Sequence, residues 1–548
     1  MRVIGNPGGG WRWWSRVSLL VAVAIVFGAL PGGVEAQALY YRSIPIGERA
    51  IGLGGAFTGV ASDPSSTYYN PAGMMRGGRF ELLGSFSSIV FTRQKIVNAF
   101  DAPEADETFT TTRLTPLPRF IGTVVKLGRK KFDDDHQFAL GYSTLEVARD
   151  DFGTGISQND PTVTLDLRVN NFYRDRWYGV SFAAQVTEKS AVGFTIFLAE
   201  QKFNYGEDIG IATGGTFDEQ LGLRVGGDSV TASSSINVTA YHFVPRLGWI
   251  HRINPEWQIG VMFQTPGIPL SQKGDVIRRV TTDISPDPST FFLFDADGLK
   301  AKMPIPFELR AGFGFQINTE TLLSFDAAVA GPVKDETLFG RPDQLAGIDG
   351  RLGVYLSPSI ARRWTPNFAV GAEHKFGKIV VAGGLFTNIS SAPDVPETSD
   401  QYVPDQVNMW GASVSVGVDT KGYRLTLGAT GMYGKGDALG VVVDNNADVV
   451  SYRRTEATRL AVVLYIAGAV SVATKGAKDV GDKYKDRKER RENGEDGGTD
   501  TGTGADTDAD TGADADTGAD TDAGTDTGAD TGAGADTDPG TATGAEGP

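Results

Sequence analysis

Few side chains of this sequence are of the types that catalysis or metal binding requires. There is no cysteine, which excludes thiolate metal sites, disulfides and a lipid-modified N-terminal cysteine. The four histidines lie far apart, without the short spacings of a metal site: His136, His242, His251 and His374. A hydrolase would need a serine nucleophile beside one of them, and no serine can be assigned to that role. We therefore expect neither an enzyme nor a bound cofactor or metal.

Arginine is the remaining side chain with useful chemistry, because a guanidinium can hold a carboxylate through two parallel hydrogen bonds. Three arginines occupy positions that alternate with apolar residues: Arg168, Arg310 and Arg424. If these positions face a polar interior, the three side chains are candidates for contacts with the head group of an acidic ligand. The alternative is that each pairs with a neighbouring acid, such as Asp166 or Glu308.

The segments that hold these arginines are expected to be β-strands. Apolar residues occupy most alternate positions from Phe307 to Ile317, and Arg310 lies on the opposite face. Similar alternation recurs along the chain and predicts about fourteen strands. They are expected at 79–93, 116–127, 137–148, 161–187, 191–205, 232–252, 257–282, 303–316, 320–331, 365–376, 379–390, 406–418, 423–435 and 457–472.

Short and long connections alternate between these strands. The long ones are expected at 94–115, 149–160, 206–231, 283–302, 332–364, 391–405 and 436–456. This alternation is typical of an outer-membrane β-barrel, which has tight periplasmic turns and long external loops. A soluble β-sandwich, the alternative, has no reason to place every long loop at one end. No apolar run is long enough for a membrane helix, so a spanning chain must be a closed barrel.

The predicted lumen has room for a plug. A barrel of this size encloses more volume than side chains usually fill, and many lumen positions hold glycine or serine, such as Gly312 and Ser413. Residues 37–78 precede the first strand and are rich in glycine. Within them, Asp63-Pro64 and Asn70-Pro71 each place a helix-capping residue before proline, which predicts short helical turns. Gly52, Gly54, Gly55 and Gly59 would permit close backbone contact with the wall.

This N-terminal segment resembles that of the FadL/TodX family, outer-membrane transporters of long-chain fatty acids and other hydrophobic compounds. The matching elements are Gly47-Glu48-Arg49-Ala50, Gly52-Leu53-Gly54-Gly55-Ala56 and Tyr69-Asn70-Pro71-Ala72-Gly73-Met74. Looser similarities follow at Met303-Pro304-Ile305-Pro306-Phe307 and Ser391-Ala392-Pro393. The resemblance covers residues 37–473.

The resemblance implies a fourteen-stranded barrel whose lumen is closed by an N-terminal hatch. A hydrophobic ligand would be captured outside, enter an apolar pocket and leave either sideways or past a rearranged hatch. Asn70, Pro71 and Ala72 carry over as hatch residues. The same hatch motif is expected to include Gly47, Arg49, Gly52, Gly54, Gly55 and Gly73. The remaining partners would be the lipid and lipopolysaccharide of the outer membrane, around a monomer.

The two ends of the chain differ from the middle. Arg2, Arg12 and Arg16 precede the apolar run Val17–Leu30, which predicts a signal peptide cleaved near Ala36. Of the net charge of −16, residues 499–548 supply −13 through twelve Asp and one Glu. The rest is almost neutral, so no nucleic-acid partner is expected. The expected parts are a signal peptide (1–36), a hatch (37–78), a barrel (79–473), a charged spacer (474–493) and a disordered acidic tail (494–548) in the periplasm.

We therefore predict an all-β, outer-membrane barrel that takes up hydrophobic small molecules passively, with long-chain fatty acids as the preferred cargo. Two alternatives are a plugged barrel that serves as a secretion or surface-attachment scaffold, and a porin. A transporter would have an apolar pocket in the lumen. A scaffold would fill the lumen with side chains and display external loops such as 332–364.

Overall fold

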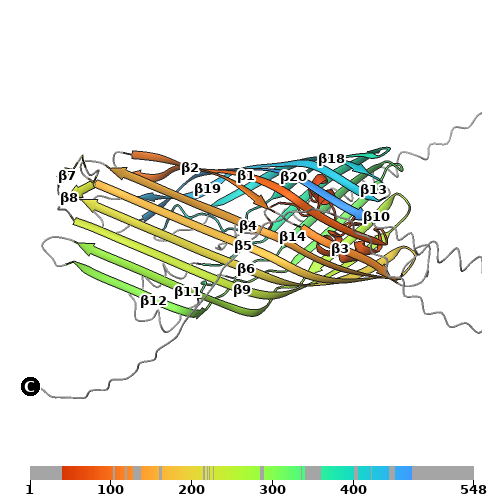
Figure 1. Ribbon diagram of the computed structural model, residues 1–548, viewed down its shortest axis with the longest axis horizontal. Coiled ribbons are helices and arrows are strands. Elements are labelled where there is room, and N and C mark those ends of the chain that lie inside the picture. The colour runs from red at the N-terminus through yellow and green to blue at the C-terminus, as the bar shows by residue number, and fades with distance from the viewer. Residues whose placement is uncertain are drawn as a thin grey trace, which may run out of the picture. The chain divides into compact units, whose positions relative to one another are not determined.

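Figure 1 shows the computed structural model of the chain, in which long tilted strands form a barrel. The chain divides into two units after Thr474, and all described residues belong to the first. They are residues 40–42, 44–102, 105–117, 120–127, 137–159, 163–213, 216–218, 220, 223–225, 228–283, 289–334, 336–339, 359–399, 405–420, 422–442 and 451–471. The expected signal peptide (1–36), spacer (474–493) and acidic tail (494–548) lie outside these ranges.

The described strands form a closed, antiparallel, fourteen-stranded wall. Each of three wall strands consists of two consecutive elements, β2 with β3, β10 with β11, and β12 with β13. The wall closes where β1 pairs with β20, and β7, β8 and β17 are short outer elements. The bounds are β1 (Phe80–Ala102), β2 (Ala105–Leu117), β3 (Phe120–Leu127), β4 (Phe138–Asn159), β5 (Val163–Gln185), β6 (Ser190–Thr213), β7 (Thr216–Asp218), β8 (Leu223–Val225), β9 (Asp228–Arg252), β10 (Trp257–Gln264), β11 (Ile268–Asp283), β12 (Thr290–Lys300), β13 (Glu308–Gln316), β14 (Thr321–Ala330), β15 (Thr365–Phe376), β16 (Ile379–Asn388), β17 (Thr398–Ser399), β18 (Gln406–Asp419), β19 (Tyr423–Val442) and β20 (Ser451–Ser471).

All fourteen expected strands are present, but several are longer than the sequence pattern indicated. A loop was expected at 94–115, yet only residues 103–104 separate β1 from β2. The same correction applies to the expected loops at 149–160, 206–231, 283–302 and 436–456, large parts of which are strand. Beyond the membrane no lipid-facing side imposes apolar residues at alternate positions. Strand pairing therefore continues where the alternation fades.

A belt of exposed aliphatic side chains surrounds the wall next to the short turns. On β18 and β19 the alternate residues Val414, Val416, Val418, Leu425 and Leu427 are 41–54 % exposed. Exposed aromatic residues border this belt: Phe138, Phe376 and Tyr423 at the short turns, and Tyr241, Trp410 and Tyr433 further along their strands. About ten tilted residues separate the two borders, which gives a height of about 25 Å, that of the apolar band of membrane barrels. Such a belt faces lipid rather than water.

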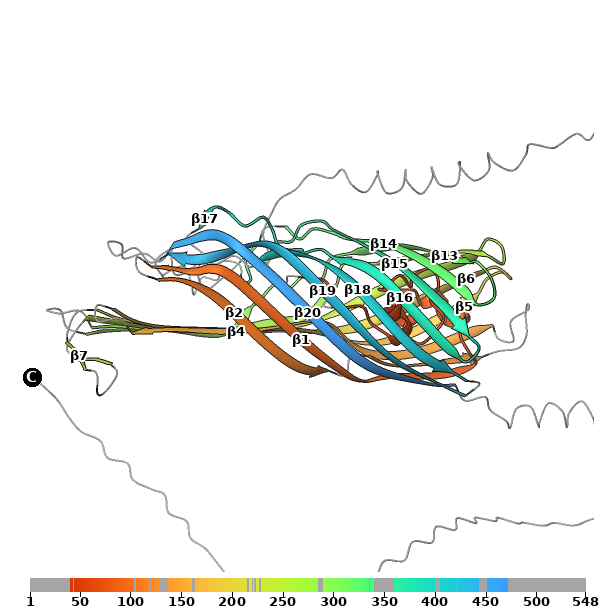
Figure 2. The same ribbon diagram turned by 90° about the horizontal axis from the view of Figure 1, so that it is seen from above.

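One boundary in the wall is only partly paired. β3 pairs with β4 from Leu127↔Phe138 up to Phe120↔Leu145. Beyond Leu145, the described part of β4 pairs only with β5, and β2 pairs only with β1. We call this boundary between β2 and the outer part of β4 the seam. In Figure 2 the outer ends of β2 and β4 belong to two groups of strands that diverge.

Candidate functional site

The N-terminal segment fills the lumen as the sequence predicted. Figures 1 and 2 show it inside the barrel, toward the end with the short turns. Every residue from Ile44 to Met75 is buried, except Arg49 and Ser62, which are half-buried. This hatch contains three helical turns, α2 (Glu48–Gly52), α3 (Ser66–Tyr69) and η1 (Pro71–Met75). No helix in the described part of the chain is long and apolar enough to cross a membrane.

Asn70 both starts a helical turn and fastens it to the wall. Its side-chain oxygen accepts the Ala72 N–H at 3.2 Å, and Pro71 follows at the first helical position. Its amide nitrogen donates to the carbonyl oxygens of Thr58 in the hatch, at 3.1 Å, and of Trp249 on β9, at 3.0 Å. The turn that the Asn70-Pro71 pair predicted is thus confirmed. One side chain joins two parts of the hatch to one strand.

Wall glycines let the wall approach the hatch closely, and at six of them the two backbones touch. An added Cβ on Gly193 would lie 2.3 Å from the Ala72 nitrogen, and one on Gly384 would lie 2.3 Å from the Leu53 carbonyl carbon. Because both neighbours are backbone atoms, no rotamer change could relieve the overlap. We call the following set the glycine ring: Gly122, Gly141, Gly193, Gly248, Gly260, Gly312, Gly371 and Gly384, on eight different strands.

The glycines of the hatch itself divide into two groups. Gly52 approaches Ser415, Gly54 approaches the backbone of Gly384, and Gly59 approaches that of Gly312, so these three face the wall as expected. Gly55 does not, because its nearest neighbours are Pro45 and Tyr69 within the hatch. Two further motif glycines also pack within the hatch, Gly47 against Ser65 and Gly73 against Ala61.

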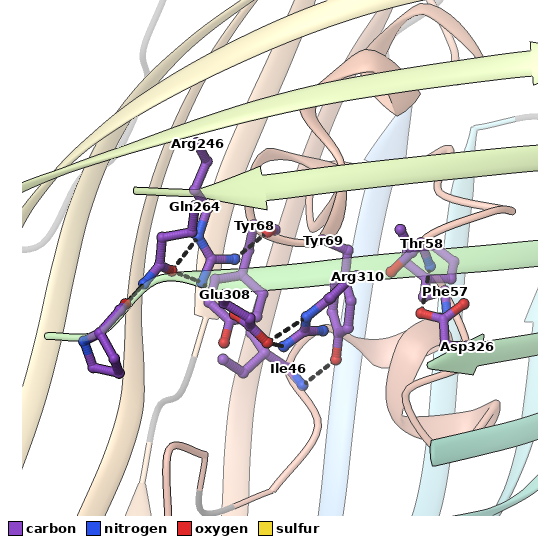
Figure 3. Close-up of polar contacts among 11 residues, drawn as sticks. Ile46, Phe57, Thr58, Tyr68, Tyr69, Arg246, Gln264, Glu308, Arg310 and Asp326 are labelled. Carbon is purple, nitrogen blue, oxygen red and sulfur yellow. Dashed lines mark hydrogen bonds and ion pairs between the residues drawn. The ribbon is translucent and has the colours of Figure 1, made fainter. Parts of the chain in front are cut away.

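Two buried wall arginines share one carboxylate and bind the hatch (Figure 3). Arg246 on β9 and Arg310 on β13 each have side chains only 1 % exposed. Arg246 Nη2 donates to Glu308 Oε2 at 3.2 Å, and Arg310 Nε donates to Glu308 Oε1 at 2.6 Å. Arg246 also donates to Gln264 Oε1 at 2.6 and 3.0 Å and to the Tyr68 carbonyl oxygen of the hatch. Buried charges are costly without such partners, so the docked hatch helps to stabilise these cations.

The hatch also donates backbone hydrogen bonds to an acid of the wall. Asp326 Oδ2 on β14 accepts the Phe57 N–H at 3.1 Å and the Thr58 N–H at 2.8 Å (Figure 3). Within the hatch, Ile46 N–H donates to the Tyr69 hydroxyl at 3.0 Å. These bonds give partners to backbone amides of the hatch that lie outside its helical turns.

Two contacts between an arginine and a carboxyl group fasten the start of the hatch. Arg49 binds Glu373 on β15 in a bidentate manner, with N–O distances of 2.7 and 3.0 Å. Arg424 lies 2.9 Å from Asp419 and 3.8 Å from Glu48 of the hatch. Burial raises the pKa of Glu48 to about 8, although the positive charge of Arg424 opposes the rise. Glu48 is therefore the hatch group whose protonation responds to pH near neutrality.

The structure does not bring the three candidate arginines together. Arg310 is in the hatch contact, Arg424 lies at the short-turn end, and Arg168 lies near the outer end of β5, 66 % exposed and 3.4 Å from Asp166. Each thus has an acidic partner, as the alternative interpretation anticipated. Their role as head-group contacts stays a prediction.

A pocket lies between the leading residues of the described chain, the hatch and the wall. Tyr40 donates its hydroxyl hydrogen to the Val407 carbonyl oxygen at 2.7 Å, and Tyr41 donates to that of Gly331 at 3.1 Å. Aromatic and guanidinium groups are prominent in the lining, which includes Tyr40, Tyr41, Tyr68, Tyr173, Trp177, Phe307, Arg42, Arg246 and Arg362. The acids of the lining are Asp175 and Glu308. The lining thus combines aromatic surface with a few polar groups.

The sequence analysis missed most of this lining. Arg246 occupies a lumen-facing position of the expected strand 232–252, and that pattern could have identified it. Tyr40-Tyr41-Arg42 falls at the start of the expected hatch, where two adjacent aromatic residues and a cation were the available signal. Arg362 could not have been found, because it lies in the long connection 332–364.

Beyond the pocket, away from the short turns, the inner face of the outer strands carries an apolar cluster. Phe203, Ile236, Val238 and Val276 of this face belong to one buried cluster. Leu338, Phe339 and Ile360, from the connection 332–364, pack against them. Leu338, Phe339 and Ile360 of that connection therefore pack inward against the wall.

The histidines lie in ordinary polar contacts. His251 bonds Ser190 at 2.7 Å, His374 bonds Thr321 at 2.8 Å, and His242 bonds Gln272 at 2.9 Å. His136 lies outside the described residues. Among the residues that the structure describes, no group of three His, Asp or Glu side chains could hold a metal ion.

Two solved structures have a similar fold over most of this chain. A Pseudomonas aeruginosa FadL homologue matches with a TM-score of 0.51 at 13 % identity, covering 80 % of this chain and 100 % of the other. The Pseudomonas putida toluene transporter TodX matches with a TM-score of 0.50 at 12 % identity, covering 80 % and 99 %. No protein-family model and no curated protein sequence matches the chain. At these identities the likeness establishes the fold, a plugged fourteen-stranded barrel of the FadL type.

Proposed function

We propose that the protein belongs to the FadL/TodX family and admits hydrophobic small molecules passively across the outer membrane, with long-chain fatty acids as its preferred cargo. The apolar belt supports a membrane location, and the plugged FadL-type fold supports the channel. In this proposal the chain is a monomer surrounded by lipid and lipopolysaccharide. The signal peptide (1–36) is removed, and the acidic tail lies in the periplasm.

The lining of the pocket is the observation that carries the proposal. Its aromatic rings provide apolar surface for a hydrocarbon chain, whereas Arg42, Arg246 and Arg362 outnumber the two acids Asp175 and Glu308. This excess of guanidinium groups favours an anionic head group. A fatty acid combines the two chemistries, and toluene offers only the first.

The apolar inner face supports a route from outside to this pocket. We infer that a ligand that enters from outside displaces part of the buried cluster around Phe203 and Val238 on its way to the aromatic lining. Straight passage through the barrel is blocked, because the glycine ring holds the hatch in backbone contact with the wall. A lumen closed in this way does not favour the porin alternative.

Binding by a fatty acid and by the matching alcohol tests the proposal. We expect hexadecanoic acid to bind the delipidated protein at least about tenfold more tightly than hexadecan-1-ol, because charge-assisted hydrogen bonds are about twice as strong as neutral ones. Trp177 lines the pocket, so its fluorescence should report binding. The signal should disappear in Trp177→Phe and remain in Trp257→Phe, whose ring packs against Phe315 instead.

Two outcomes would contradict different parts of the proposal. Equal affinities for acid and alcohol would remove the fatty-acid preference and leave hydrophobic uptake. If neither ligand binds, and extraction of the purified protein yields no fatty acid by mass spectrometry, the uptake function itself is wrong.

A further inference from the structure

Basic residues form a row across six neighbouring strands, β4, β5, β6, β9, β11 and β12, which lie side by side in Figure 1. Strand pairing places Arg149 opposite Arg174, and Arg174 opposite Lys202. The same rung continues through Thr239 to two lysines. We call the five cations of this rung the basic row: Arg149, Arg174, Lys202, Lys273 and Lys300.

The side chains of the basic row point away from the lumen. Successive residues of a strand face opposite sides of the wall. Tyr173 and Asp175 line the pocket, so Arg174 between them points outward. Lys202 follows the pocket residue Gln201, and its side chain is 37 % exposed. The basic row therefore faces the surroundings of the barrel.

Two cations of the row share one acid. Glu200 lies 2.9 Å from Lys202 and 3.6 Å from Arg174. Arg174 is also flanked by cations on both neighbouring strands, Arg149 and Lys202, and directly opposed like charges destabilise a pair of strands. Because one carboxylate balances only one positive charge, an excess of positive charge remains here.

The other end of the row holds two lysines that face each other. Lys273 pairs directly with Lys300, and both are exposed. Neither makes an ion pair with a residue that the structure describes. Asp275, two positions along β11 from Lys273, accepts the Gly298 N–H at 2.8 Å. This pairing costs stability unless an anion from outside lies against it.

The basic row lies just above the apolar belt, on the side of the long connections. One rung nearer the short turns, Glu200 pairs with Tyr241, which belongs to the aromatic border of the belt. On the next rung Leu198 pairs with Phe243, and both are exposed. Two residues of a tilted strand separate the row from the border, which is about 5 Å along the barrel axis. This height corresponds to the layer of lipid head groups.

We propose that the basic row binds the phosphate groups of lipopolysaccharide in the outer leaflet around the barrel. The proposal rests on the outer-membrane location proposed above and is independent of the cargo. Long connections are external in such barrels, so the lipid at this level belongs to the outer leaflet. With strands about 4.8 Å apart, the row is about 24 Å wide. A lipid with several phosphate groups can contact several of these cations at once, while its acyl chains cover Leu198 and Phe243.

A triple variant of the three lysines tests the row without altering the lumen. It combines Lys202→Gln, Lys273→Gln and Lys300→Gln. Protein in micelles of an uncharged detergent is mixed with rising fractions of lipid A, the phosphorylated lipid part of lipopolysaccharide, and native mass spectrometry counts the bound molecules. We expect the triple variant to need about tenfold more lipid A for half occupancy, which corresponds to about 1.4 kcal/mol over three surface contacts.

A matched control removes the same charge from the opposite rim. Lys189, Arg252 and Lys378 are exposed at the short turns, so replacing all three with glutamine should leave lipid A binding as in the parent. Equal binding by the parent and the row variant would overturn the proposal. An equal loss in the control variant would also overturn it, because net charge alone would then explain the effect.

Two other lipids identify the group that is bound. Lipid A without its phosphate groups should bind the parent and the row variant equally. Phosphatidylglycerol, which has one phosphate group, should bind the parent at least about tenfold more weakly than lipid A does. If phosphatidylglycerol bound as tightly as lipid A and lost affinity in the row variant, the row would be a site for anionic lipids in general and the assignment to lipopolysaccharide would be wrong.

Thermal unfolding provides a second measurement. Without lipid A, the row variant should be at least as stable as the parent, because it lacks the repulsion between lysines. Added lipid A should raise the Tm of the parent and of the control variant more than that of the row variant. A row variant that is less stable without lipid would contradict the repulsion on which the proposal depends.

The basic row and the pocket can fail separately. Because the row faces outward, the row variant should bind hexadecanoic acid as the parent does. Loss of the difference in lipid A binding, with fatty-acid binding intact, overturns the row alone. Failure of fatty-acid binding overturns the proposed cargo and leaves the result for lipid A as it stands.

Discussion

Gly384 and its neighbour Gly383 provide a sharp test of the glycine ring. The two residues are adjacent on β16 and point to opposite faces of the wall. A Cβ on Gly384 would lie 2.3 Å from the Leu53 carbonyl carbon and 2.4 Å from the Gly54 nitrogen, both in the hatch backbone. A Cβ on Gly383 would meet nothing nearer than the Ser413 oxygen at 3.6 Å. Alanine at both positions therefore adds the same methyl group in two different surroundings.

The expected cost of Gly384→Ala follows from this geometry. The hatch and the strand must separate by about 1 Å before the new methyl group reaches ordinary van der Waals distance. Overpacking of this kind typically costs about 1–3 kcal/mol. Gly383→Ala should be neutral or slightly stabilising, because glycine within a strand is less favourable than alanine by roughly 0.5–1 kcal/mol.

Planar-bilayer conductance and limited proteolysis of the hatch would measure the difference. A displaced hatch should let ions pass and should be cleaved faster, so Gly384→Ala should exceed both the parent and Gly383→Ala in each assay. The reasoning would be refuted if the two alanine variants behaved alike. It would also fail if Gly384→Ala matched the parent, because the hatch would then have room that the structure does not give it.

Two further predictions concern charge. Glu308→Gln should destabilise the docked hatch by about 3 kcal/mol, because it leaves the sheltered cations Arg246 and Arg310 without their carboxylate. The control Glu336→Gln breaks an exposed pair and should cost below about 1 kcal/mol in the same denaturant titration. Equal costs for the two variants would contradict the hatch role of Glu308. Docking should weaken as the pH rises from 4.5 to about 8, because docked Glu48 retains a proton that the released hatch loses above its ordinary pKa of 4.5. Proteolysis at pH 5 and pH 9 measures this change, and a dependence that persists in Glu48→Gln would exclude Glu48 as its source.

The strands of the wall could be predicted because their alternating pattern depends only on neighbouring residues in the sequence. A strand between lipid and lumen must alternate, and a pattern of period two can be read from residues such as Val414, Val416 and Val418 alone. The hatch was predictable for a similar reason, since Asn70-Pro71 determines a helical turn over three residues. The lengths of the outer strands were not predictable, because lipid no longer selects one face there.

The polar contacts were beyond reach for a different reason. Arg310 and Glu308 are two residues apart, so their pairing could be anticipated, but Arg246 joins them from 62 positions away from Glu308. The alternating pattern predicts which face of a strand a side chain occupies. It does not predict which strand lies across the lumen from it. The seam had one local signal, Pro116 and Pro118 near the start of the expected strand 116–127. Proline has no N–H to donate to a ladder, so it is found on edge strands, at strand starts and at bulges.

The contact between hatch and glycine ring also restricts the order in which the protein can be built. Where the wall glycines touch the hatch backbone, a closed barrel leaves the hatch little room to slide in from either end. We therefore expect the hatch to occupy the interior before β1 and β20 pair, as they do at Ser85↔Ala467. The barrel closes only when β1 pairs with β20, about 380 positions further along the chain, and long-range pairings of this kind slow folding. The hatch would then act as a template for barrel assembly. Variants that loosen the hatch should lower the yield of assembled protein before they alter transport.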